Sequence, residues 1–255
     1  MLEYAPLGII GILTPQANTT VEPEFSILCP PGISLLTARL TSKKNSMGDR
    51  LVDYVISMEK TLDRFANAPL SAVAFACTGA AYLVEPEEEN AKLNEIQNLR
   101  GYPVITAANA VADALKLLNA KKVGIVSPYG DLLHKRALRY WTNRGVEILA
   151  VHRIKNTDNG FHPIYSLSAN ASEEGLGELN VTSAEAIVML GTGLPTLSTL
   201  MLTKYTETPI ISPNLCLMWR TYTSIMLKTP SLENLLPWVS GNIWRKRYKA
   251  SILSS

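Results

Sequence analysis

The sequence predicts an α/β fold of two pseudo-symmetric halves, each with a parallel sheet, and an active site in the crevice between them. Two observations lead to this prediction. Short β-branched runs alternate with longer amphipathic stretches, which is typical of βαβ units around a parallel sheet. In addition, three strand ends of the first half recur in the second half, at separations of 106 to 114 residues.

The elements of the first half follow from the spacing of its apolar residues. Short apolar runs predict strands at residues 7–13, 33–40, 72–77 and 103–105. Apolar residues at helical spacing predict helices at residues 22–28, 49–65, 87–99 and 108–118. The longest of these helices places four apolar residues on one stripe, namely Leu51, Val55, Met58 and Leu62.

The internal repeat defines the domain organisation. The matched segments are residues 12–15 with 125–128, 76–79 with 190–193, and 102–106 with 208–212. Ligands of open parallel sheets bind beyond the carboxyl ends of the strands, so Cys77 and Gly191 are expected at mirror-related positions of one crevice. The predicted units are residues 1–119 and 120–228, with residues 229–255 forming a C-terminal helix that packs back on the first half.

Composition excludes several classes of function. The chain has 255 residues, 47% hydrophobic and 18% charged, as expected of a globular protein. A net charge of +2 is too weak to gather nucleic acid or a membrane surface, and no apolar stretch reaches the roughly 20 residues of a membrane span. Three cysteines without close spacing indicate a reducing compartment. We therefore expect a cytoplasmic protein without a signal peptide, whose partner is a small molecule.

Cys77 is the candidate catalytic residue. It ends a buried strand and precedes Thr78 and Gly79, whose amides and hydroxyl are expected to stabilise a thiolate and lower the thiol pKa from about 8.5. The alternative is a cysteine that only fills space in the core, which is common for this residue type. The repeat favours the catalytic interpretation, because it places Cys77 at the crevice.

Further polar residues at the strand ends are candidate substrate-binding groups. Asn18 and Thr19 follow the first strand and are expected to hold a carboxylate at the start of a short helix, with a plain helix cap as the alternative. Tyr129 takes the equivalent place in the second half, where a packed aromatic ring is the alternative. Thr192 and Gly193 follow the matching strand end and offer donors, or only form a turn.

No cofactor and no metal are expected. The sequence contains no Walker-type or GxGxxG loop, so nothing indicates a nucleotide cofactor. His152 and His162 are not spaced with acidic residues as a metal site requires, and His134 is expected on a solvated helix face. The basic segment at residues 244–249 is expected to be a solvated helix end.

Three segments resemble those of maleate cis-trans isomerases. Residues 15–25 resemble the N-terminal motif of that family, residues 76–79 resemble its first cysteine motif, and residues 127–129 resemble its tyrosine loop. The resemblance covers most of the chain and extends to arylmalonate decarboxylases and, more distantly, to the aspartate, glutamate and hydantoin racemases. It implies a cofactor-independent enzyme in which Asn18 and Tyr129 bind a substrate carboxylate and Cys77 reacts. By analogy it also implies a homodimer or homotetramer.

One departure from the family pattern leaves alternatives open. Gly191 stands where isomerases and racemases carry a second cysteine, and two-base racemisation needs an acid and a base on opposite faces of the carbon. Arylmalonate decarboxylases have one cysteine in the second half, which is the inverse arrangement. The favoured interpretation is a maleate isomerase-like enzyme with Cys77 as nucleophile. The alternatives are a decarboxylase with Cys77 as proton donor and a non-catalytic carboxylate-binding relative.

Overall fold

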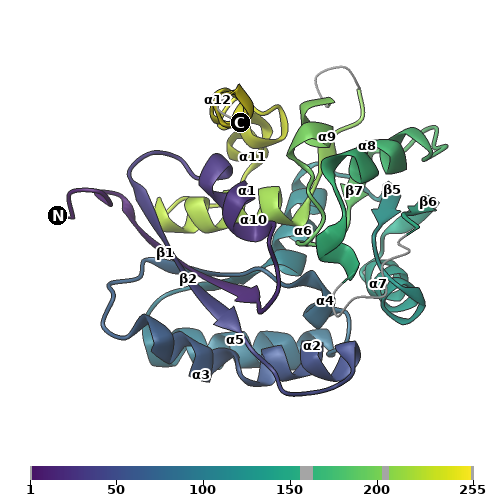
Figure 1. The fold of residues 1–255 in the computed structure, drawn as a ribbon. Coiled ribbons are helices and arrows are strands. Elements are labelled where there is room, and N and C mark those ends of the chain that lie inside the picture. Colours follow the sequence, from purple (N-terminus) through teal and green to yellow (C-terminus); the bar gives the residue numbers. More distant parts are fainter. Residues whose placement is uncertain (1, 156–162, 203–206, 254–255) are drawn as a thin grey trace.

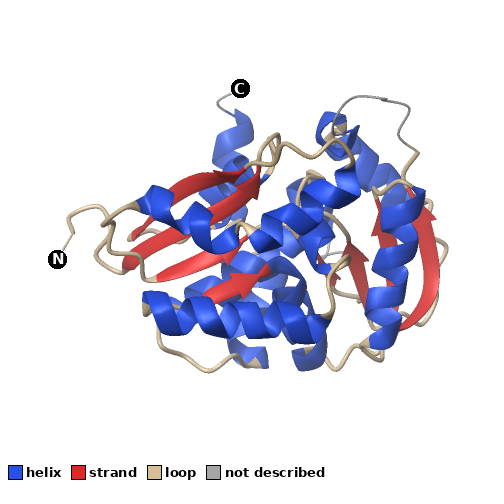
Figure 2. Cartoon of the chain, turned by 90° about the horizontal axis from the view of Figure 1, so that it is seen from below, coloured by secondary structure: helices blue, strands red, loops and turns tan. Residues whose placement is uncertain are grey.

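The computed structural model describes residues 2–155, 163–202 and 207–253, whose strands form two four-stranded parallel sheets. The strand order is β2-β1-β3-β4 in the first sheet and β6-β5-β7-β8 in the second, which is the same order shifted by four strands. Figures 1 and 2 show the two sheets as separate groups with helices packed around each. These findings confirm the predicted α/β fold of two similar halves.

The inner strands of both sheets are buried on both faces. The first sheet contains β1 (Gly8–Pro15), β2 (Ile33–Leu40), β3 (Ala72–Phe75) and β4 (Val104–Thr106). The second contains β5 (Lys122–Ser127), β6 (Glu147–Arg153), β7 (Ala186–Met189) and β8 (Ile210–Ile211). All residues of β3 and β7 are buried, whereas the edge strand β6 alternates between exposed and half-buried residues. Helices on both faces of a parallel sheet explain the continuous burial.

Helices connect the strands along the chain. Those that follow the strands of the first sheet are α1 (Val21–Leu28), α2 (Met47–Ile56), α3 (Met58–Leu62), α4 (Thr78–Ala81), α5 (Pro86–Arg100) and α6 (Ala107–Leu117). Those that follow the strands of the second are α7 (Asp131–Asn143), α8 (Ala169–Gly177), α9 (Leu197–Met201) and α10 (Pro213–Ile225). The C-terminal helices are α11 (Leu232–Val239) and α12 (Arg245–Leu253), and the 3₁₀ turns are η1 (Asp63–Phe65) and η2 (Pro163–Ser166).

One predicted helix is divided in the structure. The sequence predicts a single helix over residues 49–65, but α2, α3 and η1 occupy that segment. The break lies at Ser57, whose hydroxyl donates to the Asp53 carbonyl at 2.7 Å. Such back-bonding by serine bends a helix and offers its backbone an alternative turn. The four residues of the predicted stripe are nevertheless all buried.

Backbone hydrogen bonds at equivalent positions establish the repeat in atomic detail. Ala76 N–H donates to the Leu13 carbonyl, and Leu190 N–H donates to the Val126 carbonyl, both at 2.8 Å. Likewise, Val73 N–H donates to Pro103 and Ile187 N–H to Pro209, both at 2.9 Å. The residues that precede Cys77 and Gly191 are therefore held by the same ladder in each half, and the two residues leave their sheets at matching points.

The last helix of the second repeat crosses to the first half. Helix α10 packs against β3, β4 and α6, and Figure 1 shows it alongside the first sheet rather than the second. The Thr106 hydroxyl accepts from Asn109 N–H at the start of α6, and the Ser212 hydroxyl accepts from Leu215 N–H at the start of α10. The two helices therefore begin with the same cap, although α10 packs on the first half and not on its own sheet. The predicted unit boundaries after residues 119 and 228 stay predictions.

The C-terminal segment forms two helices instead of the single helix that the sequence predicts. Gly241, with φ of +78°, ends α11 in the left-handed conformation that favours glycine, and the chain turns before α12. Helix α11 contacts α10 and α6, and α12 contacts α1. In the basic segment, Arg247 donates to the carbonyls of Ile27 and Leu28 at 2.6 and 2.9 Å, so this side chain caps α1 rather than being fully solvated.

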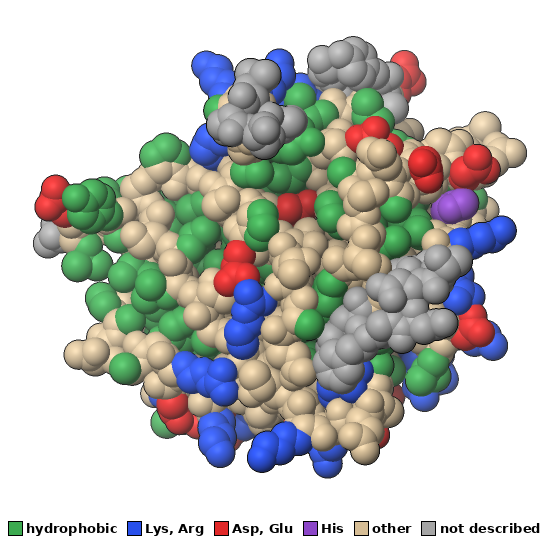
Figure 3. Space-filling model, viewed as in Figure 1, with side chains coloured by type: hydrophobic (Ala, Val, Ile, Leu, Met, Phe, Trp, Pro, Cys, Tyr) green, Lys and Arg blue, Asp and Glu red, His purple; other side chains and the backbone are tan. Residues whose placement is uncertain are grey.

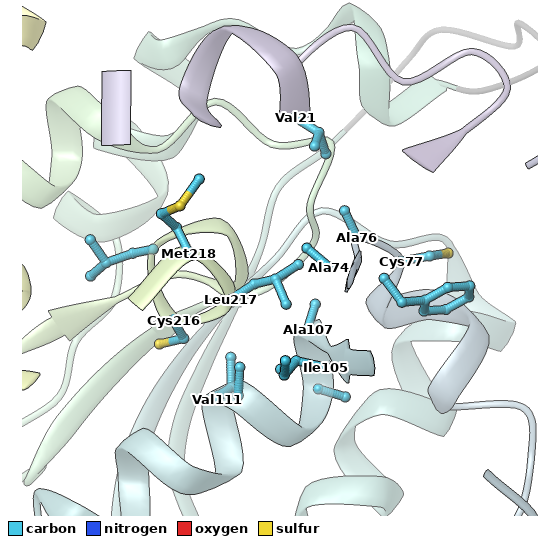
Figure 4. Close-up of a cluster of buried hydrophobic side chains, with 14 of the residues drawn as sticks. Val21, Ala74, Ala76, Cys77, Ile105, Ala107, Val111, Cys216, Leu217 and Met218 are labelled. Atoms are coloured by element: carbon cyan, nitrogen blue, oxygen red, sulfur yellow. The ribbon is translucent and has the colours of Figure 1, made fainter. Parts of the chain in front are cut away.

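A hydrophobic core joins the two halves. Figure 4 shows part of it, in which Leu217 of α10 is directed toward Ala74 of β3 and Ala107 of α6. On the face drawn in Figure 3, Lys and Arg side chains gather along the lower edge, and several acidic side chains lie at the upper right. Within the described parts of the chain, we find no helix that is both long enough and apolar enough to cross a membrane.

Candidate active site

A cavity lies between the two halves at the carboxyl ends of their strands. Residues of the first half line one side of it, namely Pro15, Met47, Leu51, Tyr54, Cys77, Thr78 and Gly79. Residues of the second half line the other side, namely Pro128, Tyr129, Gly130, Leu133, Pro163, Ile164, Tyr165, Gly191, Thr192 and Gly193. Seven of the nine residues that the sequence singles out are therefore on the wall of one cavity. Asn18 and Thr19 are not.

Cys77 is the cysteine on this wall. It lies between β3 and α4, in extended conformation at φ −144° and ψ 92°, and only 3% of its surface is exposed. Cys216 is fully buried in α10, and Figure 4 shows the two cysteines on opposite sides of the core cluster. All three cysteines of the chain are free.

The predicted lowering of the Cys77 pKa is wrong in sign. The amides of Ala80 and Gly79 do hydrogen-bond to the sulfur and lower its pKa, as expected. Burial outweighs them, and together with the charge of Glu89 it raises the pKa of Cys77 to about 12. Burial penalises the charged form of any ionisable group, and the local sequence does not reveal how deeply the thiol is enclosed.

Gly191 faces the same cavity from the second half, but its backbone leaves no room for a side chain. Its φ is +90°, which residues with a Cβ rarely adopt. A Cβ at this position would lie 2.9 Å from Pro128 Cγ and 3.0 Å from Ile164 Cδ1. The Tyr129 hydroxyl is 3.4 Å from the same point, so a tyrosine occupies the neighbourhood where the repeat would place a second thiol.

Two equivalent threonines cross the interface between the halves. The Thr78 hydroxyl lies 2.8 Å from the Tyr129 hydroxyl, and both groups are buried. From the other half, the Thr192 hydroxyl donates to the Ala76 carbonyl at 3.0 Å. Burial raises the pKa of Tyr129, with the Thr78 hydrogen bond as a smaller opposing effect. The phenol therefore keeps its proton and can donate a hydrogen bond into the cavity.

The Asn18 segment lies behind the cavity wall. The Asn18 side-chain oxygen accepts from Thr20 N–H and Val21 N–H at 2.8 and 3.1 Å, so the first amides of α1 are already paired. Its amide nitrogen donates to the Thr192 hydroxyl at 3.5 Å. Thr19 is exposed. The structure thus places Asn18 against a residue of the wall and Thr19 outside it, and their proposed contact with substrate stays a prediction.

Two tyrosines of the wall were not recognised from the sequence. Tyr54 is buried, and burial raises its pKa to about 12, with a hydrogen bond to the Gln16 backbone as a smaller opposing effect. Tyr165 packs over Gly193, where a Cβ would lie 2.4 Å from its ring. The position of Tyr54 three residues after the stripe residue Leu51 was a usable signal, because both lie on one helix face. For Tyr165 the sequence offered none.

Two arginine charges act on the tyrosines of the cavity wall from outside it. Among the described residues that line it there is no Lys, Arg or His. Burial raises the pKa of both Tyr54 and Tyr165. The charge of buried Arg50 opposes this rise at both tyrosines, and Arg39 opposes it at Tyr165. A carboxylate in this cavity would be held by hydroxyls and amides, with these arginine charges nearby.

The described residues contain no group of three or more His, Cys, Asp or Glu side chains that could hold a metal ion. The chemistry available on the wall is a thiol, five hydroxyl groups and backbone amides. Such a set can add sulfur to an electron-poor carbon, or donate a proton and stabilise an enediolate.

Relatives of known activity cover nearly the whole chain. The maleate isomerase of Geobacillus stearothermophilus is 25% identical over 248 residues, which span 89% of this chain and 96% of that protein. A cysteine-to-alanine variant of the maleate isomerase Iso from Pseudomonas putida S16, solved with maleate, superposes with a TM-score of 0.79 at 20% identity. The superposition covers 92% of this chain and 98% of the isomerase chain.

A third relative is a cysteine-to-serine variant of the Nocardia farcinica maleate cis-trans isomerase with a covalently bound succinylcysteine intermediate. Its TM-score is 0.74 at 19% identity, over 86% of this chain and 93% of that one. The family model described as arylmalonate decarboxylase matches residues 10–233, which include both strand ends of the cavity. The chain therefore belongs to the arylmalonate decarboxylase family.

Proposed function

We propose that this protein is a cofactor-independent isomerase that converts a small cis-unsaturated dicarboxylic acid, such as maleate, into its trans isomer. The observation that carries this proposal is the position of Cys77 on a cavity wall whose opposite side, at Gly191, bears no thiol. One nucleophile is sufficient for an addition and elimination sequence. A two-base racemisation would need a second acid or base at Gly191, which has no room for one.

In the proposed reaction, the sulfur of Cys77 bonds to one alkene carbon of the substrate. The π electrons move onto the adjacent carboxyl group, which becomes an enediol-type group and takes up the thiol proton. The former double bond is now single and rotates. The addition then reverses: the carbon–sulfur bond breaks, the proton returns to sulfur, and the trans acid leaves. Atoms and protons balance without a cofactor.

The wall residues have distinct roles in this proposal. Because burial raises the pKa of Cys77 to about 12, the thiol carries its proton near neutral pH and loses it only as sulfur bonds to carbon. The hydrogen-bonded pair of Tyr129 and Thr78 is expected to donate one proton to a hydrogen bond with the developing enediolate. The backbone amides of the Thr192–Gly193 turn are expected to hold the second carboxylate. Asn18 supports Thr192 from behind.

A decarboxylase is the second candidate, and one observation favours it specifically. A thiol with a pKa of about 12 is a proton donor at neutral pH, which is the role that a decarboxylase needs. A malonate-type acid would lose carbon dioxide, the resulting enediolate would accept the proton of Cys77 at carbon, and the thiolate would recover a proton from water. The product would be protonated from the face of the first half.

Proton NMR of the purified protein with maleate, and separately with methylphenylmalonate, tests these candidates. Fumarate formed by the parent protein and not by Cys77→Ala would support the isomerase. Release of carbon dioxide from methylphenylmalonate, with a product of one handedness, would support the decarboxylase. If neither acid reacts but either one binds, the non-catalytic alternative is favoured.

We also propose that the protein acts in the cytoplasm and as a homo-oligomer. The three free cysteines support a reducing compartment. Light scattering coupled to size-exclusion chromatography tests the assembly, since a 27.9 kDa species would be a monomer and would refute the second part of this proposal.

A further inference from the structure

The loop that carries the second-half wall of the cavity is tied to the first half by buried hydrogen bonds. We call residues 191–196 the wall loop. The Thr20 hydroxyl donates to the Gly193 carbonyl at 2.9 Å, and the Thr192 hydroxyl donates to the Ala76 carbonyl. At the far end of the loop, Thr196 N–H donates to the Glu24 carboxyl group at 2.6 Å. The position of Thr192 and Gly193 relative to Cys77 thus depends on these contacts.

Glu24 is the ionisable residue among these anchors. It lies on α1 with 5% of its surface exposed and reaches across the interface between the halves. Besides Thr196 N–H, it accepts from the Thr196 hydroxyl and from the Asn214 side-chain amide, the latter at 2.8 Å. The same Asn214 amide donates to the Thr192 carbonyl at 3.1 Å. Through Asn214, the carboxyl group therefore supports both ends of the wall loop.

No cationic side chain among the described residues pairs with this carboxyl group. Arg39 pairs with Glu22 at the other side of α1, and Arg247 of α12 donates to carbonyls at the C-terminal end of that helix. On α12, the charge of Glu24 makes a small contribution to the raised pKa of Tyr248. Helix α10 contributes Asn214, a neutral group.

We propose that Glu24 is a positioning residue, whose carboxyl group anchors the wall loop of the second half beside Cys77 and whose ionisation sets how readily that loop detaches. The inference extends beyond the proposed function, because it concerns how the two halves are held in register at the cavity. Glu24 touches neither Cys77 nor the cavity and acts through Thr196, Asn214 and Thr192.

The direction of the pH effect follows from burial. Desolvation raises the pKa of Glu24 from its ordinary 4.5 to about 7, with the hydrogen bonds from Thr196 and Asn214 opposing the shift. A detached loop would return the carboxylate to water and to its ordinary pKa. Below pH 4.5 Glu24 is protonated in both states, so its ionisation does not affect the opening equilibrium. As pH rises from 4.5 to 7, the detached state loses its proton first, and opening becomes easier. The shift corresponds to a change of about 100-fold in the opening equilibrium.

Residue-resolved amide hydrogen exchange of the whole protein tests the proposal. After correction for the intrinsic pH dependence of exchange, opening at Thr196 N–H should increase by about 100-fold between pH 4.5 and 7 in the parent protein. In Glu24→Gln, which cannot ionise, this increase should disappear. The matched control Glu22→Gln removes a half-buried carboxylate of the same helix, which pairs with Arg39 and not with the wall loop, and should behave like the parent. Loss of the pH response in both variants, or none in the parent, would overturn the proposal.

A second measurement links the anchor to the cavity. Glu24→Ala leaves Thr196 N–H and the Asn214 amide without their acceptor, so kcat/KM for the acid that the parent converts should fall by about 10- to 100-fold, with Glu22→Ala unchanged. This arm rests on the proposed function, whereas the exchange arm does not. If the parent converts no acid, the proposed function fails, and the exchange data still decide the role of Glu24. Unaltered kcat/KM in Glu24→Ala would contradict the positioning role.

Discussion

The two halves of this protein reach their shared cavity with the same strand order but different chemistry. In the first half, the strand end carries Cys77, in extended conformation and with two amides directed at its sulfur. In the second half, the equivalent strand end carries Gly191, at φ +90° and with Pro128 and Ile164 packed where a side chain would begin. The absence of a side chain at Gly191 therefore depends on its backbone conformation and on its packed neighbours, and not on residue identity alone.

The largest expected effect comes from removing the thiol of the first half. Cys77→Ala should lower the rate of maleate conversion by about 10³-fold or more, because the group that bonds to the substrate is absent. The matched control is Cys216→Ala, which deletes a thiol that lies in the core and does not line the cavity. Conversion measured by proton NMR checks both variants. Equal loss in both would mean that stability, and not chemistry at Cys77, limits the rate.

The second prediction concerns the pH dependence of thiol reactivity. With a pKa of about 12, the thiolate fraction of Cys77 should rise tenfold per pH unit from neutral pH, and alkylation by iodoacetamide should be about 100-fold faster at pH 9 than at pH 7. Cys216 should stay unmodified in the folded protein, because it is fully buried. Mass spectrometry of the labelled peptides separates the two sites.

A labelling rate that levels off near pH 8 would contradict this prediction. It would show that the amides of Gly79 and Ala80 outweigh burial, as the sequence alone suggests.

The raised pKa of Cys77 also has a consequence for stability. Because the folded pKa lies above that of the unfolded chain, the contribution of Cys77 is fully present below about pH 9 and is lost as pH rises toward 12.

Restoring a thiol to the second half should cost stability. Gly191→Cys places a Cβ at a positive φ and 2.9 Å from Pro128, so the free energy of unfolding should fall by about 1–3 kcal/mol. Gly177→Cys is the control, since a Cβ at Gly177 meets no atom within 4 Å. Urea denaturation followed by tryptophan fluorescence compares them. If both variants are equally stable, the backbone does not exclude the second cysteine and the comparison between the halves weakens.

The smallest expected effect belongs to the hydrogen bond that joins the two walls. Thr78→Val keeps the shape of the side chain but removes the partner of the Tyr129 hydroxyl, which should cost about 1 kcal/mol in stability. Thr78→Ser, which retains the hydroxyl, is the matched control. Thermal unfolding of both variants checks the difference. A larger loss in Thr78→Ser than in Thr78→Val would show that the methyl group, and not the hydrogen bond, matters.

Much of the fold could be predicted from the sequence because its signals are local. Apolar spacing located the strands of the first sheet, and the repeated strand ends identified the second half. The resemblance to maleate isomerases and arylmalonate decarboxylases, carried by three short motifs, is confirmed by the match of the family model over residues 10–233. The helix over residues 49–65 was wrongly predicted as continuous, because apolar spacing does not register the side-chain hydrogen bond of Ser57.

The candidate site could be predicted in part. Strand ends of a parallel sheet meet at one edge, so the repeat was sufficient to bring Cys77, Tyr129 and Gly191 together. Tyr165 and Glu24 were missed because their contacts join segments that are distant in the chain. Glu24 reaches Thr196 and Asn214 across more than 170 residues, and no local pattern encodes such a contact.

The sequence by itself determined the strands of the first sheet, the duplication and the identity of the thiol at a repeated strand end. Each of these depends on residue type and spacing along the chain. Only the tertiary structure decided the protonation state of Cys77, the exclusion of a side chain at Gly191 and the anchoring role of Glu24. These properties depend on desolvation and on steric contact, and both are set by neighbours that the chain brings together only when it folds.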